Sequence, residues 1–236
     1  VVGLIILMLA SIHQPDFLSY LGFFHKISLS DIFIVLDNIQ FVSSNNSWTH
    51  RDKILTKDGP KWITISHKKN SRHELINNIE ISYTSDWKSR SINLIKENYR
   101  KSDYFKEVMP LVDEIYNYSP TKLFDFNMRS IKIILNVLKI NPKIILASEV
   151  NVQGKKNQLL INLLRELKIN KYLAGDGSKA YMDIEKFKES NIDIIWHNYI
   201  HPKYKQMHGK FEKNLSIIDC MFNIGIDQTN KLLKQK

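Results

Sequence analysis

Alternating apolar and polar stretches divide the chain into short segments that predict strands and helices in turn. The first apolar run ends at His13-Gln14-Pro15, and Pro15 cannot continue a strand ladder. Apolar residues then recur at three- and four-residue spacing, which is typical of one face of a helix. They are Phe17, Leu18, Leu21, Phe24 and Ile27. Asp31 precedes an almost wholly apolar run, as expected of a strand buried on both faces. Residues 12–41 therefore predict a strand, loop, helix and strand.

The middle of the chain has a different pattern. The turn-forming composition of residues 57–60 joins 52–55 to the alternating segment 61–66, which predicts a hairpin. Residues 79–83 predict a short strand. Asp86 is a plausible N-cap for a helix that runs to Tyr99, and residues 104–116 and 122–138 predict two more helices.

Strands and helices alternate again towards the C-terminus. Strands are expected at 144–147, 171–174 and 192–196, with helices at 157–167 and 184–189. A late helix at 216–223 is expected to stop at Gly225. This alternation predicts an α/β fold, Rossmann-like, with a mostly parallel sheet and a mixed α+β insertion in the middle. We expect one domain over 8–228, with the core sheet from 8–45 and 140–228, the insertion at 46–139, and residues 1–7 as a non-native or misannotated extension.

Composition and charge narrow the classes of protein. The single cysteine, Cys220, excludes an internal disulfide and fits a cytoplasmic location; within its apolar segment it is expected to be buried and inert. The first apolar stretch is too short to span a bilayer. The net charge of +10 points to an anionic partner, but the lysines are scattered and no arginine-rich arm exists. A small anionic substrate is thus favoured over nucleic acid. The apolar C-terminal helix before Gly225 allows a homodimer.

Polar residues follow several of the predicted strands and are the candidates for chemistry. Ligands of open α/β sheets bind at the carboxyl ends of strands, so His13, Gln14 and Asp37 are predicted to lie at one crevice. We expect His13 to act as base or acid, oriented by Asp37 or Gln14. Alternatively, His13 and Asp37 merely end their strands and bond to the backbone of loops.

Three further clusters supply candidate substrate-binding residues. Arg51, Lys203 and Lys205 are expected to hold phosphates. The other candidates are polar or aromatic: Trp48, His50, Asp176, Ser178, Tyr181, His201, Tyr204 and Gln206. Trp48 could stack on a ligand or pack its own loop, and the turn Gly175–Ser178 could cradle a phosphate or be a plain turn. No metal site is expected, since no HExxH motif occurs and the one His-x-x-x-His spacing, His197 to His201, lies near a predicted strand end and not on a helix.

Long motifs at both ends of the chain resemble the WbqC-like protein family. They are IHQPxFLxxLGFFxKIxxSDxFIxLDxxQF, a Trp-containing segment before Arg51 with the WITI strand, and HPxYxQ followed by NLSIIDxxFNxG. Members of this family occur in gene clusters for bacterial O-antigen and other surface polysaccharides. The resemblance implies transfer of glycine, or a related acyl group, onto a nucleotide-linked sugar to form an amide. Ser19-Tyr20 departs from the Pro-Trp that members often carry before Leu-Gly.

Two other functions are open at this point. One is an ATP-dependent ligase or a nucleotidyltransferase of the HxGH kind, but Gly22-Phe23 stands where that motif has Gly-His. The other is a non-catalytic protein that binds a nucleotide-sugar. The cofactor is unknown; an acyl donor or ATP with Mg²⁺ would serve these alternatives.

Overall fold

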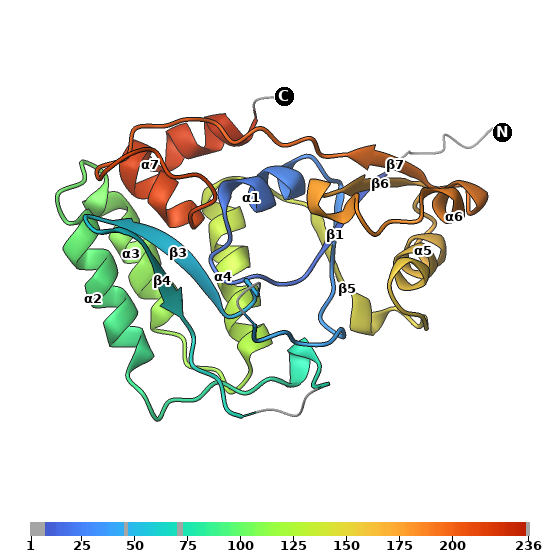
Figure 1. Cartoon of the computed structure of the whole chain (residues 1–236), viewed down its shortest axis with the longest axis horizontal. Coiled ribbons are helices and arrows are strands. Elements are labelled where there is room, and N and C mark those ends of the chain that lie inside the picture. Colours follow the sequence, from blue (N-terminus) through green and yellow to red (C-terminus); the bar gives the residue numbers. More distant parts are fainter. Residues whose placement is uncertain (1–7, 45–46, 70–72, 235–236) are drawn as a thin grey trace. The chain divides into compact units, whose positions relative to one another are not determined.

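The computed structural model describes residues 8–44, 47–69 and 73–234. Their contacts divide the chain into two compact units (Figure 1). The first, here called the sheet unit, comprises Val1–Gln14, Lys26–Leu36 and Pro142–Ile200. The second, the hairpin unit, comprises Pro15–His25, Asp37–Asn141 and His201–Lys236. The expected single domain stays a prediction, and residues 1–7 lie outside the described residues.

The sheet unit is built on a five-stranded parallel sheet in the order β5-β2-β1-β6-β7. Its strands are β1 (Leu9–His13), β2 (Ile32–Val35), β5 (Lys143–Leu146), β6 (Lys171–Ala174) and β7 (Asp193–Trp196). The central strands β1 and β2 are apolar and largely buried, as parallel strands covered on both faces must be. The predicted α/β class and parallel sheet are confirmed.

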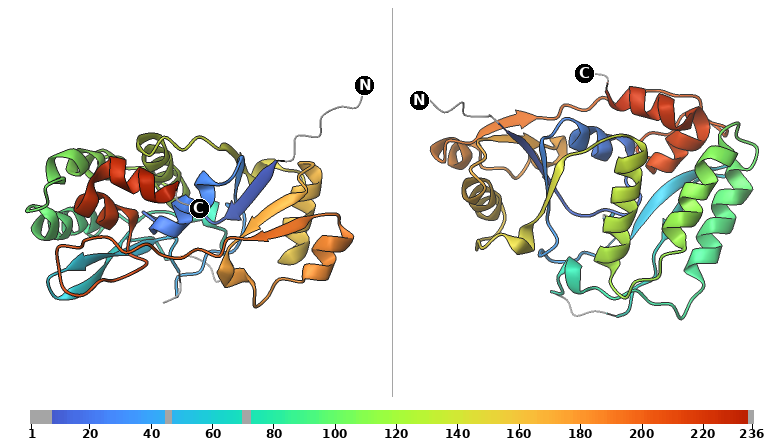
Figure 2. Two further views of the ribbon diagram at one scale, coloured as in Figure 1. Left: turned by 90° about the horizontal axis from the view of Figure 1, so that it is seen from above. Right: turned by 180° about the vertical axis from the view of Figure 1, so that it is seen from behind.

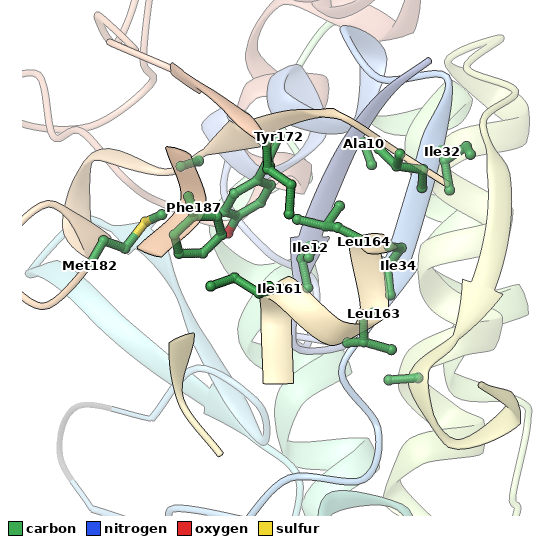
Figure 3. Close-up of a cluster of buried hydrophobic side chains, with 14 residues drawn as sticks. Ala10, Ile12, Ile32, Ile34, Ile161, Leu163, Leu164, Tyr172, Met182 and Phe187 are labelled. Atoms are coloured by element: carbon green, nitrogen blue, oxygen red, sulfur yellow. The ribbon is translucent and has the colours of Figure 1, made fainter. Parts of the chain in front are cut away.

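Helices α5 (Asn157–Glu166) and α6 (Ile184–Glu189) form the core of the sheet unit with one face of the sheet. Figure 3 shows Ile161 and Leu164 of α5 and Phe187 of α6 directed at Ile12, Ile34 and Tyr172. Since side chains alternate along a strand, Ala10 and Ile12 face this core, whereas Ser11 and His13 point to the other face. His13 therefore lies on the face of the sheet opposite the core formed with α5 and α6.

The hairpin unit pairs a two-stranded antiparallel sheet with a group of helices. Strands β3 (Arg51–Thr56) and β4 (Gly59–Thr64) confirm the predicted hairpin. Helices α2 (Trp87–Tyr99), α3 (Phe105–Tyr116) and α4 (Leu123–Val137) lie side by side (Figures 1 and 2). The Asp86 side chain accepts a hydrogen bond from the Ser89 amide and so caps α2 as expected. Helix α1 (Leu21–Ser28) is shared between the two units.

One expectation about secondary structure is wrong and another is incomplete. Residues 79–83 do not form a strand: a 3₁₀ turn, η1 (Ile76–Asn78), precedes two isolated bridges at Glu80 and Ile81. The late helix stops at Gly225 as expected, since that glycine is non-helical, but a second helical segment follows it, and the two together form α7 (Ile217–Leu233), which is kinked at Gly225. The amphipathic pattern resumes after the kink, and Thr229, Asn230 and Leu233 are buried. Two further turns, η2 (Ala147–Glu149) and η3 (Asp176–Ser178), follow β5 and β6.

Gly225 is required where it stands, for two reasons. Its φ of +81° lies in the left-handed region that side chains disfavour. A Cβ at this position would also lie 2.6 Å from the ring of Tyr104. We predict that Gly225→Ala lowers the free energy of unfolding by about 2–4 kcal/mol, from backbone strain and overpacking together.

Denaturant unfolding of the purified protein measures this loss, and Gly59→Ala is the matched control. Gly59 also has a positive φ, +100°, but nothing lies within 4 Å of its added Cβ. The control therefore carries the backbone cost alone. Equal losses for the two variants would contradict the steric role of Tyr104.

Candidate functional site at the carboxyl edge of the parallel sheet

The strand order places a topological switch point between β1 and β6. From β1 the sheet grows through β2 to β5 on one side, and the chain then returns to add β6 and β7 on the other. The loops that leave β1 and β6 therefore diverge at their carboxyl ends. Open α/β sheets bind their ligands in the crevice at this position.

His13 is the last residue of β1 and lies beside this switch point. Its carbonyl accepts a hydrogen bond from the Leu36 amide at 2.8 Å, which continues the ladder to the end of β2. Its ring Nδ1 lies 3.1 Å from the Gln14 carbonyl oxygen. A carbonyl can only accept, so Nδ1 carries the proton and Nε2 carries the lone pair. Nε2 is therefore the basic nitrogen of His13.

Lys26 brings a buried ammonium group to the same place. It extends from α1, only 5% of its surface is exposed, and its Nζ lies 3.5 Å from the carbonyl oxygen of Ile12 on β1. A Cβ added to Gly175, just after β6, would lie 3.8 Å from this Nζ. The ammonium group of Lys26 thus lies between the ends of β1 and β6.

The surroundings keep His13 neutral at physiological pH. Burial lowers its pKa to about 3, with a further contribution from the positive charge of Lys26, while the Gln14 carbonyl acts in the opposite direction. The edge therefore combines a neutral imidazole, with a defined tautomer, and the positive charge of Lys26. Such a pair can accept a proton from one group and hold a negative charge on another.

Asp176 and Ser178 lie in the turn after β6 and have structural partners. The Asp176 carboxylate accepts a hydrogen bond from the Tyr199 amide at 3.0 Å and pairs with Lys179 at 2.6 Å. The Ser178 hydroxyl donates to the Gly175 carbonyl at 2.7 Å. These bonds join the β6 turn to the segment after β7. The Tyr181 amide donates to the Ser178 carbonyl at 3.1 Å, whereas its side chain is largely solvent-exposed, with 68% of the residue's surface accessible.

The remaining predicted residues belong to the hairpin unit. Asp37 follows β2, and its carboxylate is 3.4 Å from the side-chain nitrogen of Asn77. His50 lies beside Phe41 and His67, with ring centroids 5.6 and 5.4 Å away. Burial lowers the pKa of His50 to about 4, and the charges of His67 and Arg51 add to the effect. Orientation of His13 by Asp37 stays a prediction.

Trp48 and Arg51 both pack against Trp62 of the hairpin. The ring centroids of Trp48 and Trp62 are 5.3 Å apart, and the Arg51 guanidinium lies 4.2 Å above the Trp62 ring. Arg51 also donates to the carbonyls of Ser47 and Ser44. Lys53 approaches both tryptophan rings, at 5.5 and 4.9 Å. The packing alternative for Trp48 therefore has direct contacts in its favour.

The segment His201–Gln206 is tied to a buried carboxylate. The Tyr204 hydroxyl and the Gln206 amide donate to one oxygen of Asp219, at 2.7 and 3.0 Å. The Tyr99 hydroxyl donates to the other oxygen at 2.5 Å. The His201 ring packs against Phe211 at 5.8 Å. Only Lys203 and Lys205 of this segment are exposed, so Tyr204 and Gln206 have a structural role whatever else they do.

The sequence interpretation missed several buried polar residues near these motifs. Asp16 is buried and accepts from the Thr49 hydroxyl at 3.2 Å, and Asp52 is fully buried. Burial raises the pKa of Asp52, and the negative charge of Asp16 adds to the rise. Lys26 was missed as well. Its burial was indicated in the sequence only by a charged residue within an apolar helical segment, between Phe23-Phe24-His25 and Ile27.

Residues 8–44, 47–69 and 73–234 contain neither a metal-binding cluster nor a membrane-spanning helix. Within these ranges, no three His, Cys, Asp or Glu side chains are grouped so that they could hold a metal ion. The helices of the same ranges include none with the length and apolarity needed to traverse a bilayer.

Comparison with known proteins now places the chain. The profile of the WbqC-like protein family matches residues 14–231. The chain belongs to the WbqC-like family. It is similar to the uncharacterized protein Rv1507c of Mycobacterium tuberculosis (strain ATCC 25618 / H37Rv), with 28% identity over 225 residues. That match covers 94% of this chain and 96% of the relative. No solved structure matches the chain. The resemblance deduced from the motifs is thus confirmed.

The lowered pKa of His13 predicts a pH dependence of stability for this WbqC-like protein. Between the ordinary value of about 6.5 and the folded value of about 3, the unfolded state binds more protons than the folded state. The contribution of His13 to the free energy of unfolding is therefore fully present above pH 6.5, and it is lost as the pH falls towards 3. We expect each pH unit within this window to cost at most roughly 1.4 kcal/mol through His13.

Thermal or denaturant unfolding between pH 7.5 and 4.5 measures this slope, with His13→Gln as the variant. The slope should become shallower in His13→Gln, and His50 should account for part of what remains. The exposed His73 is the matched control, because its replacement by Gln should leave the slope unchanged. An unaltered slope in His13→Gln would refute the buried neutral imidazole.

The bonds around Asp219 predict a large loss of stability when its carboxylate is removed. In Asp219→Ala the buried donors of Tyr99, Tyr204 and Gln206 lose their acceptor, which should cost on the order of 3 kcal/mol or more. Chemical denaturation measures the change. Asp103→Ala, which removes an exposed carboxylate from the same unit, should change stability by less than about 0.5 kcal/mol.

Proposed function

We propose that this WbqC-like protein is a transferase that joins an acyl or aminoacyl group, such as glycine, to an amine of a nucleotide-linked sugar. The product is an amide, formed during the biosynthesis of O-antigen or another surface glycan. The observation that supports the proposal most strongly is the pairing of neutral His13 with the Lys26 ammonium group at the switch point of the parallel sheet. Family membership is the second support.

The chemistry of amide formation needs a proton acceptor for the attacking amine. In the proposed reaction, the sugar nitrogen attacks the carbonyl carbon of an activated acyl donor, and a C–N bond forms. His13 Nε2 takes the proton that the nitrogen loses. The bond to the leaving group then breaks, and the imidazolium returns its proton to that group. The Nδ1 contact with the Gln14 carbonyl keeps Nε2 in its acceptor state for this role.

Lys26 would stabilise negative charge in this reaction. A buried ammonium group beside the strand ends can hold either a phosphate of the nucleotide or the oxyanion formed on the acyl carbon. Because Lys26 is 5% exposed, little water competes with such an anion. The acyl donor is a thioester or an acyl phosphate by this scheme, and ATP with Mg²⁺ would be needed only if a free acid is the starting material.

A two-part experiment tests this proposal. The purified protein is first screened by thermal shift against nucleotide-sugars, coenzyme A thioesters, folate derivatives, and ATP with and without Mg²⁺. A nucleotide-sugar that binds is then incubated with acyl donors and the product mass is measured. We expect a nucleotide-sugar to raise the melting temperature and to gain the mass of one acyl group.

The variants separate chemistry from binding. His13→Gln should lower kcat by about 100-fold or more while KM stays within a few-fold, and Lys26→Met should lower kcat/KM by about tenfold or more. Replacing exposed residues instead, with His73→Gln and Lys188→Met, should have no effect. Pyrophosphate release with ATP would indicate a ligase or nucleotidyltransferase in place of the transferase. Binding of a nucleotide-sugar without conversion in any combination would indicate a non-catalytic protein.

A further inference from the structure

The hairpin unit has a recess that shares no residue with the candidate site. It has a volume of about 410 Å³ and is formed by the turn between β3 and β4, the C-terminal half of α2 and the segment 207–208. All three segments belong to one unit. The volume lies within the range of pockets that hold small molecules.

Basic side chains outnumber acidic ones in the wall of this recess. Lys57, Lys61, Arg100 and Lys101 face two acids, Asp58 and Glu97. The Lys61 ammonium pairs with Asp58 at 3.0 Å, so these two charges offset each other. The remaining cations, Lys57, Arg100 and Lys101, then outnumber the one remaining acid, Glu97. The recess is therefore a region of positive potential, and an anion is the ligand that it favours.

Helix electrostatics alone does not explain this arrangement. Arg100 and Lys101 follow the last turn of α2, where cations complement the negative end of the helix dipole. Lys57 comes from the hairpin turn instead, and its positive charge meets theirs across the recess from a different element. Convergence of cations from two elements is what a site for a multiply charged group requires.

The walls of the recess are held together by one residue of α2. The Asn98 side-chain oxygen accepts a hydrogen bond from the Lys57 amide at 3.3 Å. The Asn98 carbonyl is 2.9 Å from His208 Nε2, which must donate to it. Asn98 thus links the hairpin turn and the 207–208 segment to the helix.

Apolar side chains complete the lining. Leu94 of α2 and Met207 supply a surface without charge beside the cations. An inorganic ion alone would leave this surface in contact with water, whereas an organic group attached to a phosphate would cover it. The combination of several cations with an apolar wall suits an ester of phosphate or diphosphate.

We propose that this recess is a second ligand site, which binds a small organic molecule through a phosphate or diphosphate group. The proposal does not depend on the transferase activity, because the recess has its own residues and its own readout. Nucleoside diphosphates and sugar phosphates both carry the required chemistry. The experiment therefore includes both.

Nuclear magnetic resonance titration of the full, ¹⁵N-labelled chain tests the proposal. Pyrophosphate, a nucleoside diphosphate and a hexose 1-phosphate are added separately at constant ionic strength. Binding should shift the amide signals of Lys57, Asp58, Arg100, Lys101 and His208. An organic phosphate that also shifts Leu94 and Met207, and binds more tightly than pyrophosphate, identifies the class of ligand.

Charge-reversal variants provide the control. Lys57→Glu and Lys101→Glu should each weaken binding by about tenfold or more, because each replaces an attraction with a repulsion. Lys132→Glu makes the same charge change at an exposed position on α4 and should change affinity by less than about twofold. Equal weakening by Lys132→Glu, or shifts confined to residues outside the recess, would overturn the proposal. So would the absence of any shift with all three phosphates.

Discussion

Pro15 is the constraint on which the arrangement at the centre of the chain depends. β1 pairs with parallel strands on both sides, and its ladder must end where the chain meets a residue that has no amide hydrogen. His13 is therefore the last residue in register, opposite Val35. Beyond it, the carbonyl of Pro15 needs a new partner. The Asn127 side chain supplies one at 2.7 Å and also donates to the Thr49 carbonyl at 2.6 Å.

This amide links two segments that are far apart in sequence. The Phe17 amide donates to the Trp48 carbonyl at 3.1 Å, so residues 15–17 and 48–49 form one bonded turn. Leu18 follows with a φ of +40°, and the Ser216 hydroxyl holds its carbonyl at 2.5 Å. A left-handed leucine is costly and persists only where its neighbours fix it. Residues 15–18, from the first family motif, and Ser216, from the last one, thus stabilise the same turn.

Much of the fold could be predicted because the spacing of apolar residues and the length of each segment depend only on residues close together in the sequence. The apolar run at 32–36 and the alternation at 61–66 both formed strands, and Asp86 capped α2 as its position before an amphipathic segment indicated. The continuation of α7 could not be deduced in this way. Gly225 ends the first helical segment of α7 as expected, but after the kink at φ +81° the chain resumes helical geometry and buries Leu233.

The candidate site shows where sequence reasoning reaches its limit. His13 was predictable, because a polar residue at a strand end before proline has few structural reasons to be histidine. Lys26 was not, because a lysine within an amphipathic helix usually extends into solvent. The network around Asp219 was equally hidden: Tyr204 and Gln206 were predicted as substrate-binding residues, and nothing in the sequence indicated that both donate to a buried carboxylate 13 to 15 residues away. Pairings of that kind depend on tertiary packing.

Charged side chains of both signs are buried in the two units. Lys26 lies in the sheet unit, whereas Asp16 and Asp52 lie in the hairpin unit, and all three are nearly or fully buried. Stability alone would favour apolar side chains at such positions, because taking an ion from water costs several kcal/mol. The burial of His13 and, after it, the positive charge of Lys26 lower the basicity of His13, which makes the imidazolium a strong acid once it forms. An anion that binds beside Lys26 would offset part of that positive charge and raise the basicity of His13. In the proposed reaction, ligand binding and proton transfer at the sheet edge would therefore be coupled through the electrostatic interaction between Lys26 and His13.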